Sequence, residues 1–285
     1  MPDDNDTLLL DIDAVTVRLR PYLEGLLPLL SQVRQALPPT VRDRTEVDIT
    51  ALRVGRVLHL LEAARVLAKQ GLGTAMALVA RATWETWFDT AWMLHDPTKR
   101  HERANAVWIA ALAQQVGLIY AFRDRDGYLT PPFQGALDEC ASFVKMEPDL
   151  YADWFNPDGT LRKSVHSIHA TKPNNKARAE ELDEATNSSL YGRSYDLDYT
   201  RLSLASHGEG TPLLRLMEES PGQPIRITVG EGKDGAADYF VHVCGSALAF
   251  TYEVQRAYLR GGHQRALDDL YQEIADLRTR SPSWI

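Results

Sequence analysis

Cysteine is scarce in this chain: only Cys140 and Cys244 occur among its 285 residues. The two form no metal-ligand spacing and are too few for a disulfide framework, so we expect free, reduced thiols in a cytoplasmic protein. The acidic segment Met1–Asp13 lacks the basic start and the apolar stretch of a secretory signal peptide. Together these absences exclude a small secreted fold held together by disulfides.

The short motifs of several enzyme classes are also missing. A Gly-x-Ser-x-Gly nucleophile elbow is not present. Lys233 lies in Gly-Glu-Gly-Lys-Asp-Gly, which lacks the glycine spacing and the following Ser or Thr of a phosphate-binding loop and therefore predicts a turn. His166 and His169 have no carboxylate or cysteine close by in the sequence, and paired Glu-x-x-His motifs are absent. We therefore expect neither a metal nor a cofactor.

An excess of positive charge is absent as well. The net charge of −8 argues against a general nucleic-acid coat, although it allows a local basic site. One uncharged run, Ala104–Phe122, lies between Arg103 and Arg123 and is nearly long enough to span a bilayer. Its Asn, Gln and Gly residues lower the hydrophobicity, so we expect a helix buried on most sides inside a bundle and no membrane partner.

Apolar residues recur at three- and four-residue spacing through most of the chain, which predicts a mainly α protein. The first four helices should form an antiparallel bundle and are expected at Thr16–Leu37, Ala51–Gln70, Gly73–His95 and about Lys99–Arg123. Later helices are expected at Phe133–Lys145, Pro148–Phe155, Gly192–His207 and from Ala236 or Val243 to Arg280. Pro21 and Pro28 should bend or interrupt the first helix.

A small β element should accompany these helices. Ile225–Val229 and Tyr239–Val243 have strand-like composition around a Gly-rich turn, which predicts a β-hairpin or a strand that leads into a helix. Because no internal repeat or low-complexity linker divides the chain, we expect one helical domain. Its parts are an N-terminal helix and linker (1–50), a core bundle (51–210), and the β element with a long C-terminal helix (211–285).

A charged pair lies inside the most aromatic predicted helix. Arg81 and Glu85 are one turn apart in a segment that also holds Trp84, Trp87, Phe88 and Trp92. At 100° per residue, Phe88 and Trp92 fall within about 20° of Arg81 on the helical wheel. Since buried charges are costly unless they are paired, we predict a polar centre on this face.

A second helix repeats polar residues along one face. Gly192–His207 carries Tyr195, Tyr199, Ser203 and His207 at successive four-residue steps, so neighbours in the series touch. This face is able to bind a ligand, or it supplies the hydrogen bonds that satisfy Arg81 and Glu85. We favour the structural network, because buried histidines usually have structural partners.

A stretch without acidic residues precedes that helix. Leu161–Ala179 contains five basic residues, Arg162, Lys163, Lys172, Lys176 and Arg178, together with two histidines, and an acidic run follows at once. The ordinary interpretation is a solvated loop that leads into an amphipathic helix. The alternative is a mobile basic arm for an anionic ligand.

Two segments, Arg81-Ala-Thr-Trp-Glu85 and Tyr199-Thr-Arg-Leu-Ser-Leu-Ala-Ser-His207, resemble the signature helices of a mainly bacterial helical family, domain of unknown function 5677. That family pairs an arginine–glutamate helix with a later tyrosine–serine–histidine helix. The likeness covers about Ala51–Gly208, and the family has no settled activity to transfer.

Arg201 and His207 also resemble the signature of the higher-eukaryote-and-prokaryote nucleotide-binding helical domains, many of which are RNases in toxin and phage-defence systems. In that signature four to six residues separate an arginine from a histidine, and five separate them here. Leu202 stands where a polar residue usually follows the arginine. The two side chains lie about 120° apart on an ideal wheel, so contact with one phosphate requires a bent helix end or a homodimer partner.

This second resemblance implies metal-independent RNA cleavage. His207 would act as general base or general acid, Arg201 would stabilise the pentacovalent phosphate, and the basic residues 162–178 would guide the RNA. The alternative is a non-enzymatic module that binds a small ligand or a protein and uses its Arg, Glu, Tyr and His centre structurally. An accessible His207 beside an arginine favours the enzyme, and a buried His207 with satisfied ring nitrogens favours the module.

Overall fold

The computed structural model describes residues 4–37, 46–128, 130–145, 152–162, 174–206, 217–218, 226–227, 236–259 and 264–280. These residues are mainly helical, which confirms the fold class expected from the periodicity. They fall into two compact units, whereas we expected a single domain. The main unit is Met1–Arg100 with Asn175–Ile285, and the inserted unit is His101–Asn174.

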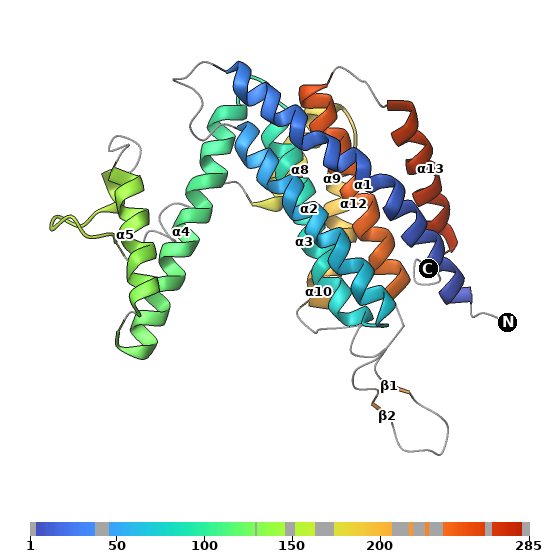
Figure 1. The fold of residues 1–285 in the computed structure, drawn as a ribbon, viewed down its shortest axis with the longest axis horizontal. Coiled ribbons are helices and arrows are strands. Elements are labelled where there is room, and N and C mark those ends of the chain that lie inside the picture. Colours follow the sequence, from blue (N-terminus) through green and yellow to red (C-terminus); the bar gives the residue numbers. More distant parts are fainter. Residues whose placement is uncertain are drawn as a thin grey trace. The chain divides into compact units, whose positions relative to one another are not determined.

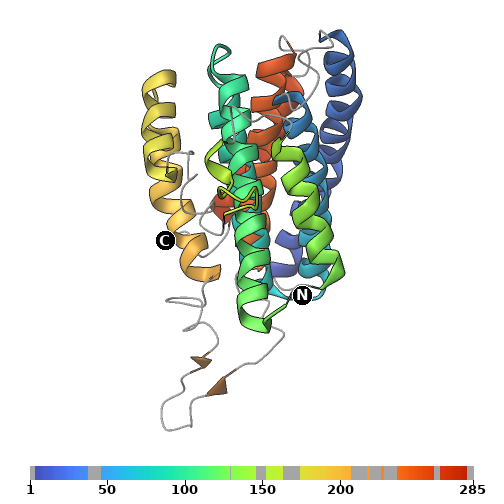
Figure 2. The same ribbon diagram turned by 90° about the vertical axis from the view of Figure 1, so that its left-hand side faces the viewer.

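The main unit is built on long helices that lie side by side (Figures 1 and 2). Its elements are α1 (Asp4–Ala36), α2 (Glu46–Lys69), α3 (Gly73–Leu94), α8 (Asn175–Thr186), α9 (Leu190–Ser194), the π-helical turn η3 (Tyr195–Tyr199), α10 (Thr200–Ser206), α12 (Ala236–Tyr258) and α13 (Gln264–Arg280). Helix α12 packs extensively against α3 and also contacts α1, α2 and α13.

Helix α1 shows how the periodicity decides the packing. One face is buried throughout, with apolar residues at steps of three or four: Leu8, Ile12, Val15, Leu19, Leu23, Leu26 and Leu30. Pro21 and Pro28 lie on the opposite, exposed face, and the helix continues without a break through both. The continuous apolar contact therefore outweighs the hydrogen bonds that the two prolines remove.

The predicted β-hairpin between Ile225–Val229 and Tyr239–Val243 is not supported. Tyr239–Val243 lies inside α12, where these residues are buried along with most of the helix. Aromatic and β-branched residues suit a strand, but they also suit a helix that is enclosed on nearly all sides, and the tertiary context decides between the two. The strand pairing in the structure joins β1 (Met217–Glu218) to β2 (Arg226–Ile227), antiparallel and two residues long.

The bundle also differs in its fourth helix. We expected Lys99–Arg123 in that place, but α4 (Arg100–Asp126) belongs from His101 onward to the inserted unit. Helix α12 takes its place beside α1, α2 and α3. The reason is the distribution of apolar residues, since α12 is apolar around most of its circumference and requires neighbours on several sides.

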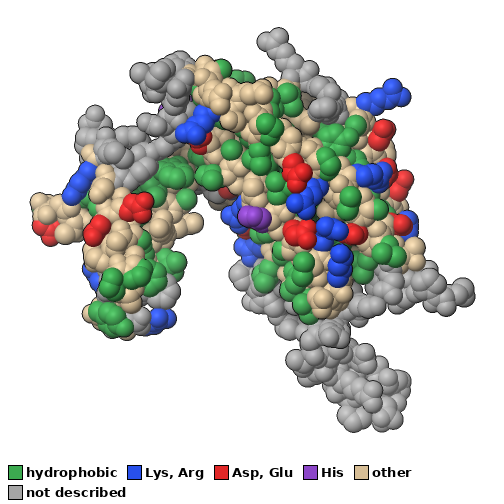
Figure 3. Space-filling view, viewed as in Figure 1, with side chains coloured by type: hydrophobic (Ala, Val, Ile, Leu, Met, Phe, Trp, Pro, Cys, Tyr) green, Lys and Arg blue, Asp and Glu red, His purple; other side chains and the backbone are tan. Residues whose placement is uncertain are grey.

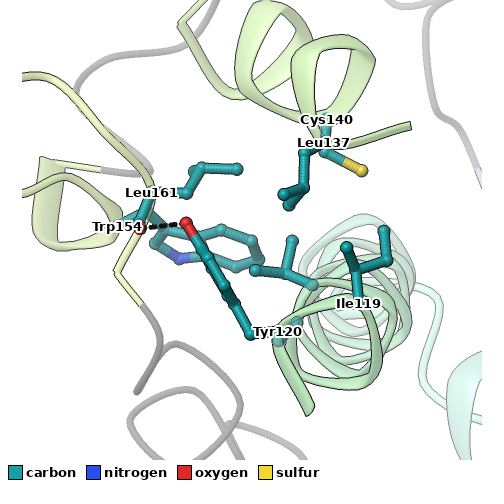
Figure 4. Packing of buried hydrophobic residues seen from close by; sticks show 8 residues of the cluster. Ile119, Tyr120, Leu137, Cys140, Trp154 and Leu161 are labelled. Carbon is teal, nitrogen blue, oxygen red and sulfur yellow. Dashed lines mark hydrogen bonds between the residues drawn. The ribbon is translucent and has the colours of Figure 1, made fainter. Parts of the chain in front are cut away.

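The inserted unit has its own small core. It contains α4, α5 (Pro131–Lys145) and the 3₁₀ turn η2 (Ala152–Trp154), and an isolated bridge pairs Phe155 with Leu161. Trp154 is fully buried there among Tyr120, Leu137 and their neighbours (Figure 4). The Tyr120 hydroxyl donates a 2.6 Å hydrogen bond to the Leu161 carbonyl oxygen, which ties the loop to α4.

Helix α4 is, within the described residues, the one helix long and apolar enough to cross a membrane by length and composition. Only 25% of its apolar window is buried, which differs from the helix buried on most sides that we expected. A single helix of this kind is weak evidence for a membrane span, because the core helices of soluble proteins have the same composition.

The face of the main unit over α1 and α2 carries acidic and basic side chains next to one another (Figure 3). Arg20 binds Glu24 at 2.7 Å, and Arg65 binds Asp13 at 2.5 Å. Because the two signs alternate, no strong field of one sign develops over these helices. Ion pairs as exposed as Arg20–Glu24 add little stability.

Candidate functional site

The two helices singled out in the sequence lie against one another. Trp87 of α3 stacks on Tyr191 with ring centroids 5.9 Å apart, and the Trp84 indole nitrogen donates to Ser194 Oγ at 2.8 Å. Arg81, one turn earlier, reaches Tyr199. Successive contacts run backwards along α3 and forwards along α9 and η3, so the two segments are antiparallel.

Arg81 lies at the junction of these helices. Its Nε donates to Glu85 Oε1 at 3.0 Å, its Nη2 donates to the Tyr199 hydroxyl at 3.5 Å, and its guanidinium lies 5.5 Å from the Tyr199 ring centroid. Burial opposes the charge on Arg81, but the hydrogen bond and negative charge of Glu85 outweigh it, so the pKa of Arg81 is raised. The predicted polar centre is therefore an ion pair that also binds the second helix.

The tyrosines of the predicted face also take part. Tyr195 and Tyr199 stack with ring centroids 5.4 Å apart, and Tyr199 lies 4.8 Å from the Trp84 ring. Ser203 is half-buried on the following turn. His207, the last member of the series, lies outside the described residues. The structure thus brings Tyr199 to Arg81, and Tyr195 stacks on Tyr199.

Asp198 connects this centre to the last helix. Its carboxylate accepts hydrogen bonds from Ser194 Oγ at 2.9 Å and from Arg278 Nη2 at 2.9 Å. Because Ser194 also accepts from Trp84, one chain of hydrogen bonds crosses from α3 through η3 to α13. Sequence reasoning missed Ser194, Asp198 and Arg278, because a π-helical turn changes which side chains face inward and no periodicity reveals it.

Arg201 points away from Arg81. Its Nη2 lies 3.6 Å from Asp238 Oδ2 on α12, and 28% of the Arg201 side chain is exposed against 3% for Asp238. Arg201 follows Tyr199 by two residues, so the two side chains leave the helix on opposite sides. The arginine proposed to act with His207 is therefore directed at a buried carboxylate.

His242 lies one turn beyond Asp238 on α12. Its Nδ1 is 3.9 Å from Asp198 Oδ1, too far for a hydrogen bond. Burial, followed by the positive charges of Arg278 and Arg201, holds the pKa of His242 well below its usual value. His242 is therefore neutral at physiological pH in the folded protein, inside a cluster of otherwise charged groups.

No family model, curated protein or solved structure matches this chain. The two family resemblances therefore stay predictions.

The expected basic arm has a different form. Arg162 Nε donates to the Phe155 carbonyl oxygen at 2.7 Å, and Arg178 is 1% exposed and binds Asp89. Lys176 is exposed on α8. Lys163 and Lys172 lie outside the described residues, as do His166 and His169. Two of the five basic residues thus hold the fold instead of projecting from it.

The cysteines are free thiols, as expected. Cys244 is buried against the Thr16 hydroxyl at 3.0 Å, and burial raises its pKa to about 12. Burial also raises the pKa of the Cys140 thiol. Neither is a nucleophile at neutral pH. In the described part of the chain, no three His, Cys, Asp or Glu side chains are grouped to hold a metal ion.

Proposed function

We propose that this chain is a non-enzymatic helical binding or interaction module, and that its polar centre is structural. The observation that supports this best is the continuous chain of hydrogen bonds from Trp84 through Ser194 and Asp198 to Arg278. In this chain of hydrogen bonds, the polar groups of the centre make contacts between helices. Such networks hold helices in one arrangement when every member is satisfied.

The charges of the centre are also matched by protein groups. Glu85 neutralises Arg81, and the carboxylate of Asp238 faces Arg201. A phosphate that used Arg201 would have to compete with a carboxylate that is 3% exposed, and leaving that carboxylate uncompensated is costly. This cost argues for a scaffold role. A cytoplasmic location, inferred from the two free thiols, belongs to the same proposal.

Metal-independent RNA cleavage by Arg201 and His207 is the second candidate. It is favoured by the position of Arg201, two residues after the end of the π-helical turn, and by its 28% exposure. π-Helical turns occur often at functional sites. A homodimer that completes the site belongs to this candidate.

The experiment is incubation of purified protein with total cellular RNA in EDTA. His207→Ala, Arg201→Ala and a mock preparation run beside the wild type, and circular dichroism reports the fold of each variant. The module hypothesis expects intact RNA throughout and reduced stability of Arg201→Ala. RNA cleavage that disappears in a folded His207→Ala variant would overturn it and establish the nuclease.

A further inference from the structure

Asp89 of α3 lies between two arginines from different helices. Arg178 of α8 donates to Asp89 Oδ1, and Arg53 of α2 donates to Asp89 Oδ2 at 3.3 Å. The side chains of Arg53 and Arg178 are 11% and 1% exposed. Two largely buried guanidinium groups therefore share one carboxylate, whose side chain is 20% exposed.

The other contacts of Arg178 do not neutralise it. It donates to the neutral side-chain oxygen of Asn175, and its guanidinium lies 5.3 Å and 5.6 Å from the ring centroids of Phe88 and Trp92. Aromatic faces stabilise a cation without cancelling its charge. Its Nε is buried and has no hydrogen-bond partner among the described residues.

A third arginine adds positive charge near Arg53. Arg56 lies one turn along α2 from Arg53, is exposed, and forms no ion pair or hydrogen bond within the described ranges. Desolvation lowers the pKa of Arg53, Asp89 opposes that shift, and the charges of Arg178 and Arg56 add to it. Glu181, which accepts a 2.7 Å hydrogen bond from the Trp92 indole, is a second acid beside the group. Within the described part of the chain, Asp89 is the one carboxylate whose charge raises the pKa of Arg53, whereas the charges of Arg178 and Arg56 both lower it.

We propose that Arg53, Arg56 and Arg178 form a binding site for a phosphate-bearing anion. A buried positive charge without a full counter-charge is costly, and a bound anion removes that cost. Guanidinium groups match phosphate oxygens in geometry and retain their charge at any physiological pH. The anion approaches from the side of Arg56, because Arg178 is enclosed by Phe88 and Trp92.

This inference rests on the proposed function in one respect: it names the ligand class of a protein that binds without cleaving. The residues are distinct from those of the Arg81 centre. The basic residues expected on a mobile arm contribute to it only through Arg178, which the fold holds in place.

The test is isothermal titration and thermal unfolding in chloride buffer, with inorganic phosphate in one arm and adenosine monophosphate in the other. We expect both probes to bind the wild-type protein, and Arg56→Gln to weaken binding about tenfold, the effect of one lost charge-assisted hydrogen bond. Arg53→Gln should abolish binding. Arg20→Gln, an exposed arginine of α1 that pairs with Glu24, is the matched control and should bind as the wild type does.

A second readout separates binding from a purely structural role. Without phosphate, Arg56→Gln should be at least as stable as the wild type, because it removes repulsion from Arg53. With phosphate, it should gain less stability than the wild type. An arginine needed only for folding would lower stability in both buffers. Because Arg56 is exposed, Arg56→Gln should fold, so it tests the site even if Arg53→Gln fails to fold.

Two results would overturn the site: no binding of either probe by the wild type, or equal binding by wild type and Arg56→Gln. Tighter binding of adenosine monophosphate would identify a phosphate ester as the ligand, and equal binding would identify free phosphate. The RNA assay tests the proposed function separately. A negative result with phosphate would therefore overturn the phosphate site without overturning the proposed function.

Discussion

Arg201 Nη2 lies 3.6 Å from Asp238 Oδ2, and Asp238 is almost fully buried on α12. The arginine that the sequence pairs with His207 thus compensates a carboxylate in the interior. Its removal should change the stability of the fold before it changes any chemistry.

Arg201→Gln should lower the free energy of unfolding by about 1–3 kcal/mol, because the charge that faces Asp238 is lost. Urea denaturation followed by circular dichroism measures this free energy. Arg201→Lys keeps a positive charge and should therefore lose less stability than Arg201→Gln. Unchanged stability together with lost RNA cleavage would instead assign Arg201 to catalysis.

Ser194→Ala should cost about 1–2 kcal/mol, since it removes the acceptor of the Trp84 indole and a donor to Asp198. Ser189→Ala is the control, because Ser189 is exposed and its side chain makes no capping hydrogen bond. The same urea experiment compares them. Equal stability of the two variants would show that the chain of hydrogen bonds adds no net stability.

Gly192→Ala should destabilise the protein by about 1 kcal/mol or more. An added Cβ would lie 2.7 Å from Asp183 Oδ2, which accepts the Gly192 backbone N–H at 2.8 Å and so caps α9. Gly25→Ala in α1 meets nothing within 4 Å and should instead gain about 0.5–1 kcal/mol from helix propensity. Thermal unfolding measures both changes, because Gly192→Ala should lower the melting temperature and Gly25→Ala should raise it. A stable Gly192→Ala would mean that Asp183 moves aside freely.

His242 should make stability depend on pH. Its pKa is lowered in the folded state, so the unfolded state binds the proton more readily. The stabilisation is complete above its ordinary pKa of about 6.5 and is lost as the pH falls below it. Denaturation at about pH 8 and pH 5.5 should show a larger loss for the wild type than for His242→Gln. Equal losses of stability in the wild type and in His242→Gln would exclude His242 as the source of the pH dependence.

The helices of this protein are predicted mainly from local periodicity. The apolar steps of α1 and the aromatic run of α3 are properties of neighbouring residues, so helices could be assigned from them. The polar face of Tyr195 and Tyr199 was visible for the same reason. Tyr239–Val243 was misassigned because strand-like composition does not distinguish a strand from an enclosed helix.

Contacts between distant segments could not be predicted in this way. Nothing near Asp198 in the sequence indicates Arg278, and nothing near Asp89 indicates Arg53 or Arg178. Each of these pairs depends on which helices become neighbours, and that follows from the burial of whole helical faces.

The sequence by itself determined a mainly helical protein, with an arginine–glutamate pair on an aromatic helix and a polar face on a later one. Only the tertiary structure decided that α12 completes the bundle, that Arg201 faces Asp238, and that Arg53 and Arg178 meet at Asp89. The physical reason is the range of the interactions. Helix periodicity is set within a few residues, whereas a charge finds its partner only after the helices have packed.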